Sequence, residues 1–321
     1  MELAPIIIFG FDRPRHLENL INSLVKNAET KNSDAYIYID GPTDKINFEN
    51  YENVKKLVSQ QLPFRNTYLT IRETNFECKW NIIKGVTEVI DKFNKVIVLE
   101  DDLIVGKYFL NYMNSALNLY KNDEKIWHIN GYCHPQLIKS KNSAAFGTLA
   151  QPWGWGTWKS KWDVFIDEKH EYTNKNIIST LTDEERKKFN FYNLASYWED
   201  ALKFDQIKKN SIWDAYWYQT IFLNKGLTLF PQISHIQNEG FDGSGLHCGI
   251  NNDFHTALNS HKTYKFPLKI KESKLYKYNT LLFFKKYQIS RYFRFHKPKF
   301  ESFESFYRWI LKKVKNLLLN K

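Results

Sequence analysis

Cysteine is scarce in this sequence, and its positions suit neither metal binding nor cross-linking. The three cysteines, Cys78, Cys133 and Cys248, lie far apart and form no CxxC pair. Neither a zinc site nor a disulfide framework is therefore indicated. Free thiols suit a reducing compartment, and no signal peptide precedes the first apolar segment, so the sequence predicts a cytoplasmic protein.

Long apolar runs and glycine-rich nucleotide loops are missing as well. No stretch reaches the roughly 18 apolar residues of a membrane span. There is no GxGxxG motif and no P-loop, so neither a dinucleotide-binding fold nor a P-loop ATPase is supported. Aromatic residues, by contrast, make up 17% of the 321 residues. Such flat, amphipathic rings often line sugar or nucleotide sites, although most of them pack in the core.

Strands and helices alternate along the first 130 residues. Apolar and β-branched runs predict strands at residues 4–9, 35–39, 67–71, 95–99 and 127–130. The spacing of apolar residues predicts helices at 17–25, 50–60, 81–93 and 108–120. This alternation predicts an α/β fold in which helices cover both faces of a parallel sheet. The second half is less regular, with a charged helical stretch at 182–210, a helix at 213–224 and a short strand at 227–230.

The segment 95–102, KVIVLEDD, joins a buried strand to three adjacent carboxylates. Because the side chains of residues 100–102 repel one another, they need a cation or strong hydrogen-bond donors at this position. Oxygen ligands of this kind suit Mn²⁺ or Mg²⁺ that also carries substrate phosphates. Asp40 likewise follows a strand, and open α/β sheets bind ligands at the carboxyl ends of their strands. The segment predicts a metal–diphosphate site, with a solvated acidic loop as the alternative.

Three further stretches each have two interpretations. Residues 151–162 contain four Trp and two Gly, which suits either a substrate wall or a tight aromatic core loop. Asp214 lies in the first turn of a predicted helix, where a carboxylate also serves as a plain helix-capping charge. Residues 240–249 contain four glycines and His247. Such a loop could fold over a bound phosphate.

In their order along the chain, these motifs resemble those of the GT-A glycosyltransferases that use nucleotide sugars. More narrowly, they are similar to a bacterial branch related to the animal N-acetylglucosaminyltransferase that starts complex N-glycan branching. The resemblance covers residues 4–250 and rests on Asp12-Arg13, Asp40, Glu100-Asp101-Asp102, Trp153–Gly156 and Trp213-Asp214. It implies a GT-A, Rossmann-like mixed sheet flanked by helices. The domain would span residues 1–260, with a nucleotide-sugar half at 1–131 and an acceptor half at 132–260.

The resemblance also implies a role for each motif on the donor side. Asp102 would bind the metal ion, and Glu100 and Asp101 would face the ribose and the donor sugar. The remaining donor-binding residues would be Asp12, Arg13 and Asp40.

On the acceptor side, the resemblance implies contacts from tryptophans and a base from the helix that follows them. The acceptor-binding residues would be Trp153, Trp155 and Trp213, and Asp214 would be the catalytic base. His247 has no counterpart in the resemblance. It is assigned as a second metal ligand or a diphosphate hydrogen-bond donor, with a plain surface histidine as the alternative.

These roles describe a sugar transfer in one displacement. The acceptor hydroxyl is too weak an acid to attack unaided, so a carboxylate must take its proton. If Asp214 lies opposite the leaving group, the anomeric configuration inverts. We therefore expect a metal-dependent, inverting hexosyl- or N-acetylhexosaminyltransferase that moves a sugar from a nucleotide donor, expected to be a UDP-sugar, to a surface glycan such as lipopolysaccharide or capsule. The alternatives are a sugar nucleotidyltransferase, and a non-catalytic membrane- or sugar-binding protein with a degenerate site.

Positive charge is concentrated in the C-terminal extension, residues 261–321. From Lys262 onward, 17 Lys or Arg face 3 Asp or Glu, a balance of +14, whereas residues 1–261 carry a balance of −3. The segment 303–319 reads as a basic amphipathic helix, which is typical of binding to an anionic membrane surface. Basic and aromatic residues together also suit nucleic acid, and a helix docked on the body is a third possibility. We favour the inner face of the cell membrane, because lipid-linked sugar acceptors are made there.

Overall fold

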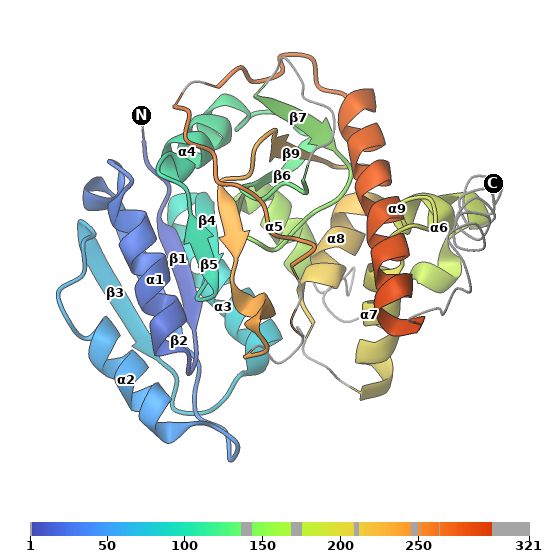
Figure 1. Ribbon diagram of the computed structural model, residues 1–321. Helices are drawn as coiled ribbons and strands as arrows, with labels where there is room; N and C mark the ends of the chain where they lie inside the picture. The colour runs from blue at the N-terminus through green and yellow to red at the C-terminus, as the bar shows by residue number, and fades with distance from the viewer. Residues whose placement is uncertain are drawn as a thin grey trace, which may run out of the picture.

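The computed structural model describes residues 2–135, 143–167, 175–208, 212–244, 250, 252–262 and 264–296, with side chains described as far as Arg291. Within these ranges, eight strands form one sheet in the order β3-β2-β1-β4-β8-β6-β9-β7, and β5 and β10 pair beside it (Figure 1). The strands are β1 (Ile6–Gly10), β2 (Asp34–Ile39), β3 (Asn66–Ile71), β4 (Lys95–Glu100), β5 (Leu103–Val105), β6 (Ile126–Asn130), β7 (Ala144–Gly147), β8 (Trp155–Trp158), β9 (Leu227–Pro231) and β10 (Ile236–Asn238).

One part of the sheet is parallel and the other is mixed. β1 lies between β2 and β4, with all three parallel, and β3 continues the parallel order at the edge. β8 then runs antiparallel between β4 and β6, and β7 runs antiparallel to β9. The expected α/β fold with a mixed sheet is confirmed. The Trp-rich stretch 151–162 was expected to be either a substrate wall or an aromatic core loop. Neither description fits the whole stretch, because its middle forms the buried strand β8.

Helices cover both faces of this sheet, as the alternation predicted. They are α1 (Pro14–Val25), α2 (Phe48–Val58), α3 (Glu77–Phe93), α4 (Phe109–Leu119), α5 (Lys159–Ile166), α6 (Asp183–Phe189), α7 (Tyr197–Lys208), α8 (Asp214–Leu223) and α9 (Lys274–His296). The charged stretch predicted at 182–210 is two helices, α6 and α7, with left-handed backbone at Phe191, Tyr192 and Asn193 between them.

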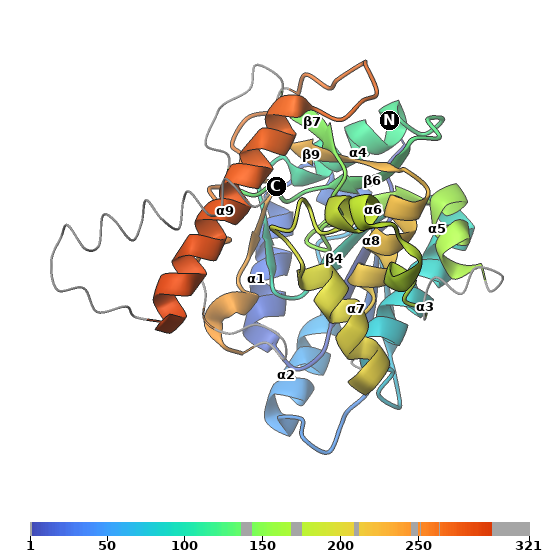
Figure 2. The same ribbon diagram turned by 90° about the vertical axis from the view of Figure 1, so that its right-hand side faces the viewer.

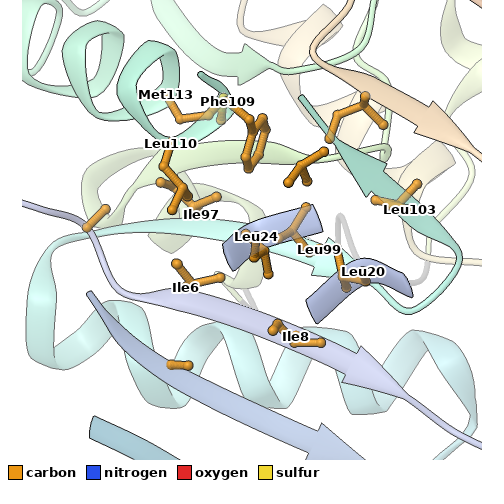
Figure 3. Close-up of a cluster of buried hydrophobic side chains, with 14 of the residues drawn as sticks. Ile6, Ile8, Leu20, Leu24, Ile97, Leu99, Leu103, Phe109, Leu110 and Met113 are labelled. Atoms are coloured by element: carbon orange, nitrogen blue, oxygen red, sulfur yellow. The ribbon is translucent and has the colours of Figure 1, made fainter. Parts of the chain in front are cut away.

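Alternating side chains of the central strands divide the interior into two cores. Ile6 and Ile8 of β1 pack with Leu99 of β4 and with apolar residues of α1 and α4 (Figure 3). On the opposite face, Ile7 and Val98 pack with residues of α3, α5 and α8. Because both faces of these strands are buried, their sequences are continuous apolar runs.

Helix α9, which lies within the predicted extension 261–321, packs against the body of the protein (Figure 2). Its Tyr276 stacks on Phe230 of β9 with 4.5 Å between ring centroids. Gly147 of β7 makes room for this ring, since a Cβ there would lie 2.5 Å from it. The amphipathic helix predicted at 303–319 lies outside the described residues. Nowhere in the described part of the chain is a helix both long and apolar enough to cross a membrane.

Candidate active site

The acidic triplet ends the central strand β4, at the carboxyl edge of the parallel strands. Glu100 closes β4, and Asp101 and Asp102 form the turn into β5. Arg13, just before α1, contacts both aspartates: Nη2 donates to Asp101 Oδ1, and Nη1 donates to Asp102 Oδ2 at 3.2 Å. The chain therefore supplies one cation to the carboxylates that the sequence predicted to need one.

Burial and like charge act together on these groups. Loss of solvation raises the pKa of Glu100 well above its usual range, and the carboxylates of Asp102 and Asp214 add to the rise. Burial also raises the pKa of Asp101 to about 6, although Arg13 opposes it. Burial alone would lower the pKa of Arg13, but the two aspartates raise it, so the guanidinium stays charged. Since one arginine faces several carboxylates, the site favours a further cation.

Asp40 lies at the end of β2, at the same edge of the sheet. Its Oδ1 accepts hydrogen bonds from the backbone N–H groups of Gly41 (2.9 Å) and Phe76 (2.8 Å). Burial raises the pKa of Asp40, and these two hydrogen bonds oppose the rise. Because Phe76 is the N-cap of α3, Asp40 also fixes where that helix begins. Asp12 is partly exposed in the turn between β1 and α1.

Asp214 is the first residue of α8 and is partly exposed. Next to loss of solvation, its charge is among the causes that raise the pKa of Glu100 and of Cys78. The fold therefore brings the predicted base close enough to the triplet for their charges to interact, although the two come from opposite halves of the chain.

Two of the three tryptophans expected to contact an acceptor are buried. Trp155 is closed to solvent and stacks on Trp213, itself 3% exposed, with 5.1 Å between ring centroids. A closed ring has no surface to offer a ligand, so this pair supports the start of α8 from inside instead. Trp153 is partly exposed and lies edge-on to Phe241, 5.5 Å between centroids. Its contact with an acceptor stays a prediction.

The sheet holds α8 by a second contact. Trp217 Nε1 donates to Nδ1 of His128 in β6 at 3.0 Å. Burial lowers the pKa of His128 to about 4. The ring is therefore neutral near pH 7, as an acceptor for an indole N–H must be.

Two exposed side chains in this region were not predicted. Cys78, in the first turn of α3, is exposed as a residue. Protein atoms around its thiol still reduce the solvation of that group, and this loss, together with nearby carboxylates, raises the pKa of the thiol. Tyr197, the first residue of α7, is 41% exposed, and its hydroxyl accepts a hydrogen bond from Gln151 at 3.1 Å. Loss of solvation raises the pKa of Tyr197, and the charge of Asp214 adds to it. A single cysteine and a single tyrosine have no spacing or motif by which the sequence could have revealed them.

The segment after β10 closes on Asp102. The backbone N–H of Glu239 donates to the Asp102 carbonyl at 2.8 Å. A Cβ on Gly240 would lie 2.3 Å from Asp102 Oδ2, so only glycine allows this approach. His247, in the same glycine-rich stretch, lies outside the described residues, and its predicted role stays a prediction.

The triplet fits a hard divalent cation that is held largely by its substrate. Among the described residues, no group of three or more His, Cys, Asp or Glu could hold a metal ion. Asp102 offers a carboxylate with a side chain 17% exposed. Mg²⁺ and similar ions typically use one or two carboxylates together with substrate phosphates and water. Asp102 therefore suits the part of single protein ligand among the described residues.

Comparison with known sequences shows what the N-terminal part of the chain is similar to. Residues 1–146 match the model of the GNT-I family, a range that includes Arg13, Asp40 and the triplet but not Asp214. The alpha-1,3-mannosyl-glycoprotein 2-beta-N-acetylglucosaminyltransferase of Arabidopsis thaliana is 23% identical over 176 residues. The alignment covers 51% of this chain and 39% of that relative, so the chain spans about two fifths of the relative's length.

Two solved structures are similar to this chain at a low level. One is S. aureus TarS 1–349 in complex with UDP-GlcNAc, with a TM-score of 0.37, 12% identity, and coverage of 72% of this chain and 57% of that one. The other is the mannosyltransferase PcManGT from Pyrobaculum calidifontis in complex with GDP-Man and Mn²⁺, with a TM-score of 0.37, 9% identity, and coverage of 70% and 73%. We base no inference on likenesses at this level.

Proposed function

We propose that this protein is a metal-dependent, inverting glycosyltransferase that moves a sugar from a nucleoside diphosphate to a hydroxyl group. The proposal rests on one observation above all: Glu100 ends β4 at the carboxyl edge of the parallel strands, and Asp214 lies close enough to add to the rise that burial and Asp102 cause in the pKa of Glu100. Open α/β sheets bind nucleotides at this edge. The match of residues 1–146 to the GNT-I family supports the same reaction class.

The donor side binds the nucleotide sugar. Asp102 holds the divalent ion, Glu100 and Asp101 face the ribose and the sugar, and Asp40 contacts the nucleoside. When bound, such an ion neutralises negative charge that develops on the leaving diphosphate. Arg13 already lies against the triplet and stays charged, so it adds fixed positive charge beside the same oxygens.

Asp214 acts as the general base. It takes the proton from the attacking hydroxyl, a contribution of about 10²–10⁴-fold in rate for a well-placed carboxylate. Attack in a single step from the side opposite the diphosphate inverts the anomeric carbon.

Exposed aromatic rings support an acceptor site for a sugar. Trp153 is partly exposed and Tyr197 is exposed, and such rings pack well against the apolar face of a sugar. We propose that the acceptor is a growing surface glycan such as lipopolysaccharide or capsule, linked to lipid. This substrate would place the protein on the inner face of the cell membrane, with its basic C-terminal segment against anionic lipid.

Donor binding is the first test. The melting temperature is measured with UDP-GlcNAc, UDP-glucose, UDP-galactose and GDP-mannose, each with and without Mn²⁺. A ligand at about 100 times its Kd stabilises the native state by about 2.7 kcal/mol. We expect one nucleotide sugar to raise the melting temperature only with Mn²⁺, and the rise to be lost in Asp102→Asn. A protein that no nucleotide sugar stabilises would contradict the proposal.

The second test separates chemistry from binding. Asp214→Asn should keep the metal-dependent stabilisation by the donor but lower its hydrolysis or transfer by about 10²-fold or more, because the base is gone. A variant with most of the wild-type activity would remove Asp214 from the mechanism. The wild type should release UDP; release of pyrophosphate would indicate a nucleotidyltransferase, and binding without turnover a sugar-binding protein.

A further inference from the structure

We propose that Asp205, with Lys79 and Tyr216, positions the base Asp214, so that this buried cluster sets the rate of transfer without touching substrate. The inference rests on the proposed function, since it takes Asp214 to be the base. It concerns residues of α7, α3 and α8 that the sequence did not indicate.

The carboxylate of Asp205 holds the chain on both sides of Asp214. Its Oδ1 accepts a hydrogen bond from the backbone N–H of Ile212 at 3.3 Å, two residues before the base. Its Oδ2 accepts one from the hydroxyl of Tyr216 at 2.9 Å, two residues after the base. One buried side chain, 7% exposed, therefore fixes both ends of the short segment that carries Asp214.

Lys79 provides the countercharge. Its Nζ lies 3.6 Å from Asp205 Oδ2 and 4.2 Å from the centre of the Tyr216 ring. The residue is only 4% exposed. Burial lowers the pKa of Lys79, and the carboxylate of Asp205 opposes that change. A charge at this depth needs its partner, so Lys79 and Asp205 together fix the gap between α3 and α7.

The same helix α3 also contacts Asp40, which we propose binds the nucleoside of the donor. Its N-cap, Phe76, donates its backbone N–H to Asp40, three residues before Lys79. Asp40, proposed to contact the nucleoside, and the segment 212–216, which carries the base Asp214, are thus both held by the first turn of α3. Since catalytic groups must lie within about 0.5 Å of the productive geometry, a loss of this tie should lower kcat more than it weakens donor binding.

The mildest test removes one hydroxyl. Tyr216→Phe loses the hydrogen bond to Asp205 but keeps the ring. Tyr218→Phe is the matched control, because it also loses a buried hydroxyl from α8, one that bonds the Phe189 carbonyl at 2.8 Å. For the carboxylate, Asp205→Asn is paired with Asp200→Asn, which changes an exposed aspartate of the same helix.

Hydrolysis of UDP-GlcNAc with Mn²⁺ is the first readout. We expect Tyr216→Phe and Asp205→Asn to lower kcat at least tenfold while KM stays within about twofold, with both controls near the wild type. An unchanged kcat would overturn the positioning role. A fall in kcat that is accompanied by a rise in KM would overturn it as well.

The thiol of Cys78 gives a readout that needs no activity. It is titrated with a thiol reagent in a Cys248→Ser background, with EDTA present. Loss of solvation raises the pKa of Cys78, and the charges of Glu100, Asp214, Asp102 and Asp40 add to the rise. Asp214→Asn should therefore lower this pKa by removing one negative charge.

If Tyr216→Phe and Asp205→Asn displace Asp214, the pKa of Cys78 in these variants should shift toward its value in Asp214→Asn. In the two control variants the pKa of Cys78 should stay at the wild-type value. Variants that keep the wild-type thiol pKa would overturn the inference. If the wild type does not hydrolyse UDP-GlcNAc, the proposed function fails for this donor, and the thiol still decides where Asp214 lies.

Discussion

At the scale of the residue, the backbone at Gly240 lies so close to Asp102 that any side chain there would meet the carboxylate. One oxygen of this carboxylate, Oδ2, accepts a hydrogen bond from Arg13 and is also the atom that a Cβ on Gly240 would meet. Its direction is therefore fixed by a cation and by the absence of a side chain. A ligand for a metal ion gains from both, because a carboxylate that cannot rotate loses less freedom on binding.

Gly240→Ala should weaken binding of the nucleotide-sugar donor without unfolding the protein. The added Cβ would lie 2.3 Å from Asp102 Oδ2, so the carboxylate must turn away. We expect the Kd of UDP-GlcNAc with Mn²⁺ to rise about tenfold, which is a loss of about 1.4 kcal/mol, in isothermal titration calorimetry. Ser244→Ala, an exposed change in the same segment, is the control. Equal affinities in the two variants would count against Asp102 as the ligand.

Glu199 predicts a pH dependence of stability. Its carboxylate, 3% exposed, accepts hydrogen bonds from Arg186, Lys203 and Asn190. The bond from Arg186, with the others, lowers the pKa of Glu199 from 4.5 to about 2. A carboxylate whose pKa is lower in the folded state stabilises the fold above its unfolded pKa, and this contribution is lost as the pH falls.

Between pH 4.5 and about 2, the wild type should therefore lose stability relative to Glu199→Gln. The loss is at most about 3 kcal/mol, and less in practice because Arg186 and Lys203 are half exposed. Urea unfolding at a series of pH values measures it. A stability difference that stays constant across this range would show that the ion pairs do not hold the carboxylate.

The sequence was informative about site residues that follow a strand. Asp40 and the triplet follow strands, and parallel strands end at one edge, so their convergence could be predicted. Trp155 and Trp213 could not be placed in the same way, because a residue type does not say whether its ring faces a core or a cleft. Tyr197 becomes notable only when α7 folds against α8.

At the scale of the element, α9 carries an apolar face into the body of the protein. Phe283 and Phe284 pack against His134, with 4.5 and 5.1 Å between ring centroids. This contact joins α9 to the segment that follows β6. These contacts involve only the first part of the charged extension, since residues 297–321 lie outside the described ranges.

Phe284→Ala should destabilise the whole protein. The ring is 1% exposed, and truncation of a buried phenylalanine typically costs about 3–5 kcal/mol. Tyr278→Ala on the same helix, where the side chain is 51% exposed, should change the free energy of unfolding by no more than about 0.5 kcal/mol. Urea unfolding compares the two. Equal, small effects would mean that α9 is not docked in solution.

Elements with strong periodicity were predicted, and those paired by tertiary contacts were not. Strands β1 and β4 are continuous apolar runs, and α1 to α4 have regular apolar spacing. β5 and β10 are three residues each and exist because they pair with one another. β8 was obscured by its tryptophans and glycines, which predict a loop as readily as a strand until β4 and β6 flank it.

At the scale of the whole molecule, charge divides the chain more sharply than the fold does. Residues 1–261 are nearly neutral, whereas the last 60 residues carry +14. This segment follows a body in which, so far as it is described, no helix could cross a membrane. Attachment to a membrane through charge would be reversible and sensitive to salt.

Membrane binding can be tested with two variants that each lose four positive charges, one in the C-terminal segment and one in the body. Replacing Arg308, Lys312, Lys313 and Lys315 with Gln should reduce sedimentation with phosphatidylglycerol vesicles by about 10²-fold or more, since each charge contributes about 1 kcal/mol. The control replaces four exposed lysines of the body, Lys26, Lys31, Lys45 and Lys121, and has the same net charge. If both variants bind equally, the segment is not the membrane anchor.

The position of β6 in the sheet has a consequence for synthesis on the ribosome. β6 is complete at Asn130, yet its neighbours are β8 and β9, which come later in the chain. At about 5–20 residues per second, the roughly 100 residues between β6 and the end of β9 take about 5–20 s to make. During that interval β1 to β4 can assemble and β8 can pair with one edge of β6, while the edge of β6 that will meet β9 has no partner. An unpaired edge of this kind invites pairing with another nascent chain, so this is the period in which a chaperone would matter most.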